Sequence, residues 1–462
     1  MAEDIETFRD HFLSIYQSAV SDVAQRIDQR APNSAKGLRP RSSLKRSASS
    51  ILPGFAADIA RREYAESRGL NVAPTGLSKR ALTAGDATRA CAELAFRYMK
   101  ASLSSDGAAL AQIQGEFKAS TCDPAWVSTI DEYLQYFGPG GSRKQIPYIR
   151  PSTVGPRTIA LKTNAKVALV GDWGTGAQPA VQILKHIAAW KPDVLIHLGD
   201  IYYSGTPVEC ASNFTSFIEA VLRCGNPDLA VYTLAGNHDM YCGGVGYYDL
   251  IQRLNPEPFT QPASFFCLRS EDEKWQLLAM DTGLHDYSPL NVDDVVTFLE
   301  DDELEWHCER IKEFPGRTIL LSHHQLFSAF SPIGKPNENG VRSSVNPHLL
   351  KAFNSMAASG SISAWFWGHE HTLSVYDQFS GLRRGRCLGH GAVPVSILDT
   401  IYEPVSRLDQ TPTTMANTRL QQQGSVYAHG YAVLAFNADN CVAEYYQDLN
   451  GKAALVHSEN FR

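Results

Sequence analysis

Two segments decide the fold: KVALVGDWGTG at residues 166–176 and PDVLIHLGDIYYSG at residues 192–205. In each, a short apolar run ends abruptly at a Gly-Asp pair, as buried strands do when they reach a turn. Residues 180–190 between them place apolar side chains at helical spacing, which predicts a strand–helix–strand unit. Such a unit joins parallel strands, and the chemistry of α/β folds gathers beyond the carboxyl ends of those strands. Asp172 and Asp200 are therefore expected at one rim of one sheet.

Polar residues also follow four later apolar runs of the chain. They are AGNHD after residues 229–234, DTG after residues 275–280, SHHQ after residues 318–321 and GHEH after residues 362–367. Any one of them could be an ordinary turn, because Asp and Asn are common in turns. The set in this order predicts a metal centre built from Asp, Asn and His side chains at the strand ends.

The mixture of residue types suits a pair of metal ions. Two cations about 3.5–4 Å apart repel each other, so an anionic ligand has to lie between them, and Asp200 is the expected bridge. Imidazole and amide groups fill the terminal positions without overcharging the site. A metal-bound hydroxide would attack while the second metal holds the oxygens of the group under attack. The predicted reaction is hydrolysis of a phosphate ester.

Five blocks of the sequence resemble the calcineurin-like metallophosphoesterase superfamily in content and order. They are GD (171–172), GDxxY (199–203), GNHD (236–239), a histidine after a strand (323) and GHxH (368–371). The resemblance covers roughly residues 165–400. It implies an α/β fold of the αββα type, a sandwich of two mixed sheets flanked by helices. The apolar segments at residues 427–436 and 441–446 resemble the hairpins that complete the second sheet.

The first block departs from the usual pattern of the superfamily, because no histidine lies two residues after Asp172. Tyr203 lies three residues after Asp200 and could take the vacant ligand position, which resembles the purple acid phosphatase branch. Both Tyr202 and Tyr203 could instead be packing aromatics. The resemblance implies a first metal held by Asp172, Asp200, Tyr203 and His371, and a second held by Asp200, Asn237, His323 and His369. A tyrosinate ligand favours Fe³⁺, paired with Fe²⁺, Mn²⁺ or Zn²⁺.

Three further residues are candidates for catalysis. His238 resembles the histidine that contacts phosphate in this family, where it stabilises the transition state or protonates the leaving oxygen. Asp239 could orient His238. His324 either contacts substrate or is a structural neighbour of His323, whereas His197 and Trp173 are interpreted as packing residues. The insertions at residues 241–248 and 327–342 are expected to flank the site and select the substrate.

Composition restricts the class of protein. The 462 residues are 44% hydrophobic and 20% charged, as in globular proteins. No run of 18 apolar residues predicts a membrane-spanning helix, and the acidic N-terminus is unlike a secretory signal. Nine scattered cysteines suit reduced thiols, so a cytoplasmic location is expected. The acidic balance after residue 150 is unfavourable for general nucleic-acid binding.

The chain is predicted to have two parts. Residues 1–150 form a helical N-terminal region with helices near residues 8–27, 56–68 and 84–99. A basic, Ser-rich segment at residues 30–50 is either a solvated loop or a docking site for a protein partner. Residues 138–156 are rich in Gly and Pro and mark the boundary, so the catalytic domain is expected at residues 160–462.

The sequence favours a dinuclear metal-dependent hydrolase of phosphate esters, either a phosphatase or a phosphodiesterase. Its substrate would be a phosphorylated small molecule or a nucleotide. The alternative is a catalytically inactive scaffold of the same fold that binds partners through residues 30–50. A third view makes residues 1–150 a regulatory lid over the catalytic domain.

Overall fold

The computed structural model describes residues 127–138, 141–142, 145–289, 295–395, 397, 401–423 and 426–461 of the chain. The chain divides into two compact units, one of residues 1–130 with 394–399 and one of residues 131–393 with 400–462. From the first unit the structure describes only residues 127–130, 394–395 and 397. The predicted helices within residues 8–99 and the basic segment at 30–50 lie outside the described residues, and the predicted boundary near residue 150 stays a prediction.

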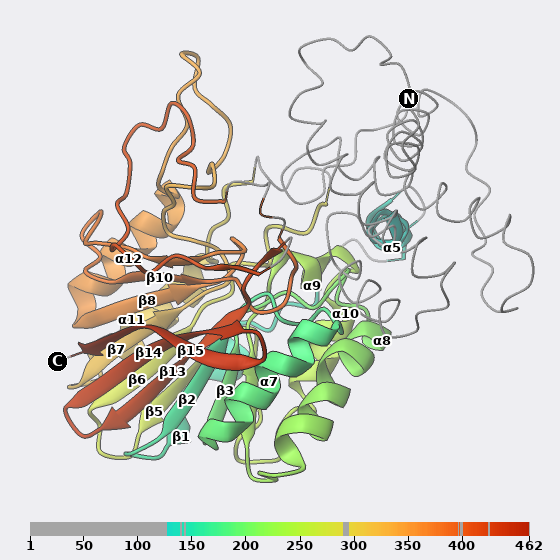
Figure 1. Cartoon of the computed structure of the whole chain (residues 1–462), viewed down its shortest axis with the longest axis vertical. Helices are drawn as coiled ribbons and strands as arrows, with labels where there is room; N and C mark the ends of the chain where they lie inside the picture. The colour runs from blue at the N-terminus through green and yellow to red at the C-terminus, as the bar shows by residue number, and fades with distance from the viewer. Residues whose placement is uncertain are drawn as a thin grey trace, which may run out of the picture. The chain divides into compact units, whose positions relative to one another are not determined.

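Two mixed β-sheets form the centre of the second unit (Figure 1). The first sheet has the order β15-β14-β13-β2-β3-β4, in which β2, β3 and β4 are parallel and β13, β14 and β15 are antiparallel. Its strands are β2 (Lys166–Val170), β3 (Val194–His197), β4 (Ala230–Thr233), β13 (Gly430–Asn437), β14 (Asn440–Leu449) and β15 (Lys452–Phe461).

The second sheet has the order β1-β5-β6-β7-β8-β10-β9. The strands β6, β7, β8 and β10 are parallel to one another. Its strands are β1 (Ile159–Leu161), β5 (Phe266–Ser270), β6 (Trp275–Ala279), β7 (Arg317–Leu321), β8 (Ile362–Trp367), β9 (Leu373–Val375) and β10 (Gly385–Leu388). A separate pair is formed by β11 (Gln422–Gln423) and β12 (Val426–Tyr427).

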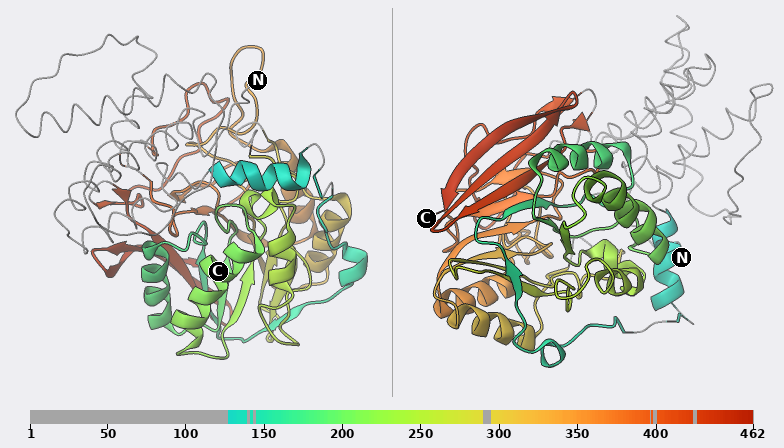
Figure 2. Two further views of the ribbon diagram at one scale, coloured as in Figure 1. Left: turned by 90° about the vertical axis from the view of Figure 1, so that its right-hand side faces the viewer. Right: turned by 90° about the horizontal axis from the view of Figure 1, so that it is seen from below.

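Helices lie on the outer face of the second sheet and on that of the β2–β4 half of the first, as the right-hand view of Figure 2 shows. On the first sheet lie α7 (Gln178–Trp190), the π-helical segments η2 (Cys210–Thr215) and η3 (Ile218–Arg223), and α10 (Val245–Ile251), which share one apolar core with β2, β3 and β4. On the second lie α11 (Asp301–Lys312) and α12 (Pro347–Ser359). The remaining helices are α5 (Val127–Phe137), α6 (Pro151–Val154), α8 (Pro207–Glu209) and α9 (Asn237–Tyr241). In the described residues, no helix combines the length and the apolar character that crossing a membrane requires.

Aromatic side chains pack the inner faces of the two sheets against each other. Trp275 of β6 meets Phe436 of β13 with 5.7 Å between ring centroids. Phe366 of β8 lies 6.1 Å from Phe461 of β15 and 6.4 Å from Tyr445 of β14. Since helices cover the other faces, strands such as β3 and β6 are buried on both sides, which explains their continuous apolar sequences.

The sandwich confirms the predicted fold class. The six strands expected from apolar runs are β2, β3, β4, β6, β7 and β8, and the helix expected at residues 180–190 is α7. The expected C-terminal hairpin is β13–β14, and β13 pairs with β2, so it extends the sheet that carries Asp172 and Asp200. The strands β1, β5, β9 and β10 were not predicted, because each is short or belongs to a segment without a clear apolar run.

Candidate metal centre

The predicted metal ligands follow the carboxyl ends of strands from both sheets. Asp172 and Asp200 follow the parallel neighbours β2 and β3, so they share one rim, as the sequence predicted. Asn237 lies after β4, His323 after β7, and His369 after β8. The rim of the sandwich thus collects polar side chains from five strands.

One cluster at this rim is formed by two carboxylates, a phenol and an imidazole. The Tyr202 hydroxyl lies 3.0 Å from Asp172 Oδ1, 3.3 Å from Asp200 Oδ2 and 3.0 Å from His371 Nε2. His371 Nε2 also lies 3.3 Å from Asp172 Oδ1. All four side chains are buried.

A second cluster shares Asp200 with the first. His323 Nε2 lies 3.3 Å from Asp200 Oδ2, 3.1 Å from Asn237 Oδ1 and 3.2 Å from His369 Nδ1. Asn237 Oδ1 lies 3.1 Å from the same nitrogen of His369. Because Asp200 belongs to both clusters, its carboxylate occupies the place that a bridging ligand needs.

Neighbouring groups aim these ligand atoms at the rim. His323 Nδ1 lies 2.9 Å from the carbonyl oxygen of Leu198, to which it donates, so Nε2 carries the lone pair that faces the cluster. Asn237 Nδ2 donates to the Tyr241 hydroxyl at 2.5 Å, which leaves Asn237 Oδ1 toward the histidines. Tyr241 was not recognised in the sequence, because its role depends on the turn that α9 makes.

The backbone at three of the ligand residues is in the left-handed region. Asp172, Asp200 and His369 have φ angles of 54°, 74° and 65°. Such a conformation costs a non-glycine residue about 1–3 kcal/mol and persists where the surrounding structure enforces it, often at functional sites. At Gly236 of the GNHD block a Cβ atom would collide with the Asp200 carboxylate, so only glycine allows this approach.

The electrostatics of the rim fit a cation. Burial alone would raise the pKa of the Asp200 carboxyl, but His323 and His238 hold it below its usual value. Burial and His323 keep the pKa of His369 well below its usual value, so its imidazole is in the neutral, ligand form. Among the described residues, the ion pairs of Asp172 and Asp200 are formed with histidines alone. Ligand atoms of Asp172, Asp200 and His323 lie within 4.8 Å of one another, as do those of His323, His324 and His369.

Comparison with known proteins identifies this part of the chain. Residues 165–373 match the family model of the calcineurin-like phosphoesterases. This segment is therefore similar to a calcineurin-like phosphoesterase domain, and it is called the phosphoesterase-like segment below. The match contains every block from GD at 171–172 to GHxH at 368–371. The family is generally hydrolytic and typically binds two metal ions.

Several solved structures are similar to the chain. "GAP50 the anchor in the inner membrane complex of Plasmodium" is 14% identical, with a TM-score of 0.42 over 65% of this chain and 89% of that chain. Vacuolar Protein Sorting 29 from Cryptosporidium parvum is 12% identical, with a TM-score of 0.29 over 65% of this chain and 99% of that chain. None of the curated proteins compared with the chain matches it.

The phosphoesterase-like segment has two adjacent tyrosines near the rim, and their contacts differ. The Tyr202 hydroxyl lies in the first cluster. Tyr203 donates its backbone N–H to Glu209 at 2.6 Å and accepts from His238 Nδ1 at its carbonyl at 2.7 Å. The spacing of the motif selects Tyr203, and this ligand stays a prediction. Sequence alone did not rank Tyr202, because the turn of the loop decides which ring faces the carboxylates.

His238 and Asp239 both lie beside Asp200 but have different partners. His238 Nδ1 contacts the Tyr203 carbonyl, and its Nε2 lies 3.9 Å from Asp200 Oδ2. Asp239 accepts backbone N–H groups of Gly236 at 2.9 Å, Asp200 at 3.0 Å and Ile201 at 3.2 Å. His238 Nδ1 is thus held by the Tyr203 carbonyl, while Asp239 ties together the two loops that carry Asp200 and Asn237, and the predicted role of Asp239 in orienting His238 stays a prediction.

Two residues interpreted as packing groups are buried as expected. His197 is fully buried in β3, with Nδ1 2.9 Å from Thr233 Oγ1. Trp173 is also fully buried and donates from Nε1 to the carbonyl of Ala180 at 2.8 Å. Both side chains belong to the core beneath the rim.

The two segments expected to select the substrate differ in burial and in their partners. Residues 241–248 are almost entirely buried, because Tyr247 and Tyr248 pack with Ile146 and Met240. This segment is part of the core. Residues 327–342 instead pair with a later loop, through Val405 N to Ala329 O at 2.9 Å and Arg342 N to Arg407 O at 3.0 Å.

Proposed function

We propose that the phosphoesterase-like segment hydrolyses phosphate esters with two metal ions held at the rim of the sandwich. One observation carries the proposal: acceptor atoms of two carboxylates, an amide and three imidazoles converge around Asp200. Buried acceptors that face each other repel unless a cation lies between them.

The two clusters support a division of the proposed ligands between two metal positions. The first position would be held by Asp172, Asp200, His371 and a tyrosine, and the second by Asp200, Asn237, His323 and His369. The contacts of its hydroxyl favour Tyr202 as the phenol, and the motif spacing favours Tyr203. A phenolate donor suits Fe³⁺ at the first position, with Fe²⁺, Mn²⁺ or Zn²⁺ at the second. Metals bound in this way lower the pKa of a water molecule and polarise phosphate oxygens.

His238 is the proposed group that contacts the phosphate. Its Nδ1 is held by the Tyr203 carbonyl, so Nε2 points toward the Asp200 side of the rim. From there Nε2 can donate to a phosphate oxygen or to the leaving oxygen. His324 is proposed to be a neighbour of the second metal position. Asp239 is proposed to fix the loops that carry Asp200 and Asn237.

The proposed substrate is a phosphorylated small molecule or a nucleotide, and both monoesters and diesters fit the metal chemistry. The proposed location is the cytoplasm, with residues 30–50 as a docking segment for a protein partner. In support of a reducing compartment, the seven cysteines in the described part of the chain form no disulfide.

The test combines metal analysis with a substrate screen on the full-length protein. The purified chain should contain two metal ions, and it should hydrolyse an aryl phosphate or a bis-aryl phosphate. A chelator should remove this activity, and Mn²⁺, Zn²⁺ or iron should restore it. Absence of turnover with all of these metals would contradict the proposal and favour the alternative, an inactive scaffold that acts through residues 30–50.

A further inference from the structure

We infer that Asp286 is a positioning residue, which holds His324 against His369 and thereby sets the affinity of the second metal position. The inference rests on the proposed function and concerns the same site. Asp286 lies in the loop after β6, which contributes none of the proposed ligands. It is buried, as are His324 and Thr282.

The His324 side chain is held at both ring nitrogens. Nε2 lies 3.1 Å from Asp286 Oδ2, and Nδ1 lies 3.1 Å from Thr282 Oγ1. The His324 backbone N–H donates to the same Thr282 oxygen at 3.0 Å. A hydroxyl that accepts from the backbone can give its own proton to Nδ1, so Nε2 carries the hydrogen and donates it to the carboxylate.

This network decides what His324 can do. His323, His324 and His369 together could be interpreted as a three-histidine ligand set. With Nδ1 accepting from Thr282 and Nε2 donating to Asp286, however, the ring has no lone pair left for a metal ion. His324 is therefore a support for the ligands and not a ligand itself.

His324 supports the proposed ligands because its ring packs against theirs. The ring of His324 lies 4.4 Å from that of His369 and 4.9 Å from that of His323, measured between centroids. Both neighbours are proposed ligands of the second position. If Asp286 no longer fixes the His324 ring, the His369 ring loses the surface against which it packs. Groups that orient metal ligands in this way typically contribute about 10–100-fold to metal affinity.

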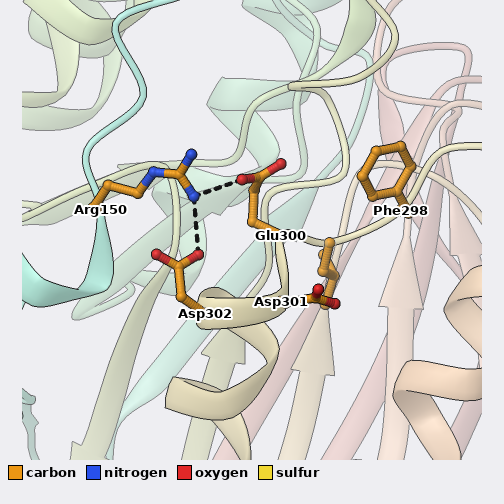
Figure 3. Close-up of a pocket in the computed structure, with 6 residues that line it drawn as sticks. Arg150, Phe298, Glu300, Asp301 and Asp302 are labelled. Atoms are coloured by element: carbon orange, nitrogen blue, oxygen red, sulfur yellow. Dashed lines mark hydrogen bonds and ion pairs between the residues drawn. The ribbon is translucent and has the colours of Figure 1, made fainter.

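The adjacent residue on the same loop provides a matched control. His285 points the other way, with Nε2 2.9 Å from Glu300 Oε1 and its ring stacked on Phe298 at 3.7 Å. Glu300 and Phe298 line a cavity of about 370 Å³, in which Glu300 also pairs with Arg150 (Figure 3). A change at His285 therefore perturbs the same loop without touching His324.

The test measures metal binding by the full-length protein at graded free Zn²⁺ or Mn²⁺. Asp286→Ala is expected to lower the affinity of one of the two bound ions by about 10–100-fold and to leave the other unchanged. Asp286→Asn keeps an acceptor for Nε2–H and should recover part of the loss. His324→Phe keeps the ring but loses both nitrogens, and it should weaken the same ion without adding to the effect of Asp286→Ala. His285→Ala should bind both ions as the wild type does.

The outcomes separate this inference from the proposed function. If the wild type binds two ions and Asp286→Ala binds both with unchanged affinity, the inference is wrong and the proposed function stands. If His285→Ala weakens the ion as strongly as Asp286→Ala, general disturbance of the loop explains the loss and the inference is also wrong. If the wild type binds no pair of ions, the proposed function and the inference fail together.

Discussion

Two buried charged clusters lie in the same sandwich and differ in how their groups are paired. Between the sheets, Arg386 donates to Glu459 from Nε at 2.6 Å and from Nη2 at 2.9 Å, and to the carbonyl of Tyr376 at 2.7 Å. The Tyr445 hydroxyl donates to Glu459 as well, at 2.7 Å. At the rim, by contrast, the carboxylates of Asp172 and Asp200 meet only a phenol, imidazoles and backbone N–H groups among the described residues.

The difference distinguishes a structural cluster from a binding site. In the Arg386 cluster each charge has an opposite charge, so the network is complete within the chain. In the rim cluster the carboxylates face a phenol and imidazoles, which are groups that can exchange a proton for a bound cation. Both clusters contain fully buried charged residues, Arg386 in one and Asp172 and Asp200 in the other, so burial by itself does not reveal function. The charges of the groups that face each other are more informative about function than their burial.

The largest expected effect is at Asp200, because this residue belongs to both clusters at the rim. Asp200→Asn removes the charge shared by both clusters. Hydrolysis should fall by at least the roughly 10²–10³-fold that one lost electrostatic contact costs an enzyme, and both metal ions should be lost. The assay is turnover of an aryl phosphate together with metal content. A variant that retains two ions and full turnover would show that Asp200 is not the bridge.

The Arg386 cluster should respond in stability and not in metal binding. Arg386→Met leaves the partly buried Glu459 with Arg384 as its remaining cationic partner, so the loss should stay at or below the roughly 3–5 kcal/mol that breaking a fully buried pair costs. Denaturant unfolding of the metal-free protein measures this loss, and metal stoichiometry should stay unchanged. Lys162→Met removes the exposed pair with Asp193, whose loss should cost less than about 1 kcal/mol. Equal losses in both variants would contradict the distinction between the two pairs.

A third prediction concerns which of the two adjacent tyrosines, Tyr202 or Tyr203, is a metal ligand at the rim. If Fe³⁺ occupies the first position, a tyrosinate ligand gives the protein a visible absorption band. The contacts predict that Tyr202→Phe abolishes this band and that Tyr203→Phe keeps it. Absorption spectra of the iron-loaded variants decide between them. Loss of the band in Tyr203→Phe alone would support the ligand that the motif spacing selects.

The smallest expected effect concerns Glu303, a buried carboxyl outside both clusters. It contacts the Tyr148 hydroxyl at 2.8 Å, the Asp281 backbone N–H at 2.8 Å and His307 Nε2 at 3.2 Å. Burial raises the pKa of Glu303 to about 8, and burial and Glu303 raise that of Asp281 to about 7. Between its usual pKa and pH 8 the folded protein therefore holds a proton at Glu303 that the unfolded chain has lost.

Stability should consequently decrease as the pH rises through this window, by at most about 1.4 kcal/mol per pH unit for one proton. Glu303→Gln should make the slope between pH 6.5 and 8.5 smaller, as measured by urea unfolding at several pH values. This range begins at the usual pKa of His307, whose pKa burial lowers to about 3, so His307 contributes to the slope only near its lower end. An unchanged slope would show that Glu303 is ionised in the folded protein.

The sequence by itself determined the strands that lead to the rim and the position of the rim. Continuous apolar runs that end in Gly-Asp, GNHD and GHEH predicted β2, β3, β4 and β8, because a strand buried on both faces can contain hardly any polar residue before its end. Parallel strands then fix which ends lie together, so Asp172 and Asp200 could be placed at one rim from local patterns alone.

Only the tertiary structure decided the contacts within the rim. Loop geometry decides which of Tyr202 and Tyr203 faces the carboxylates and which group holds His238. The contact of Asp286 with His324 depends likewise on the distance between segments far apart in the chain. The same holds for residues 241–248, which look like a Gly-rich surface loop in sequence and pack into the core. Apolar periodicity reports the burial of one element, whereas side-chain partners arise only when several elements meet, and no local pattern records that meeting.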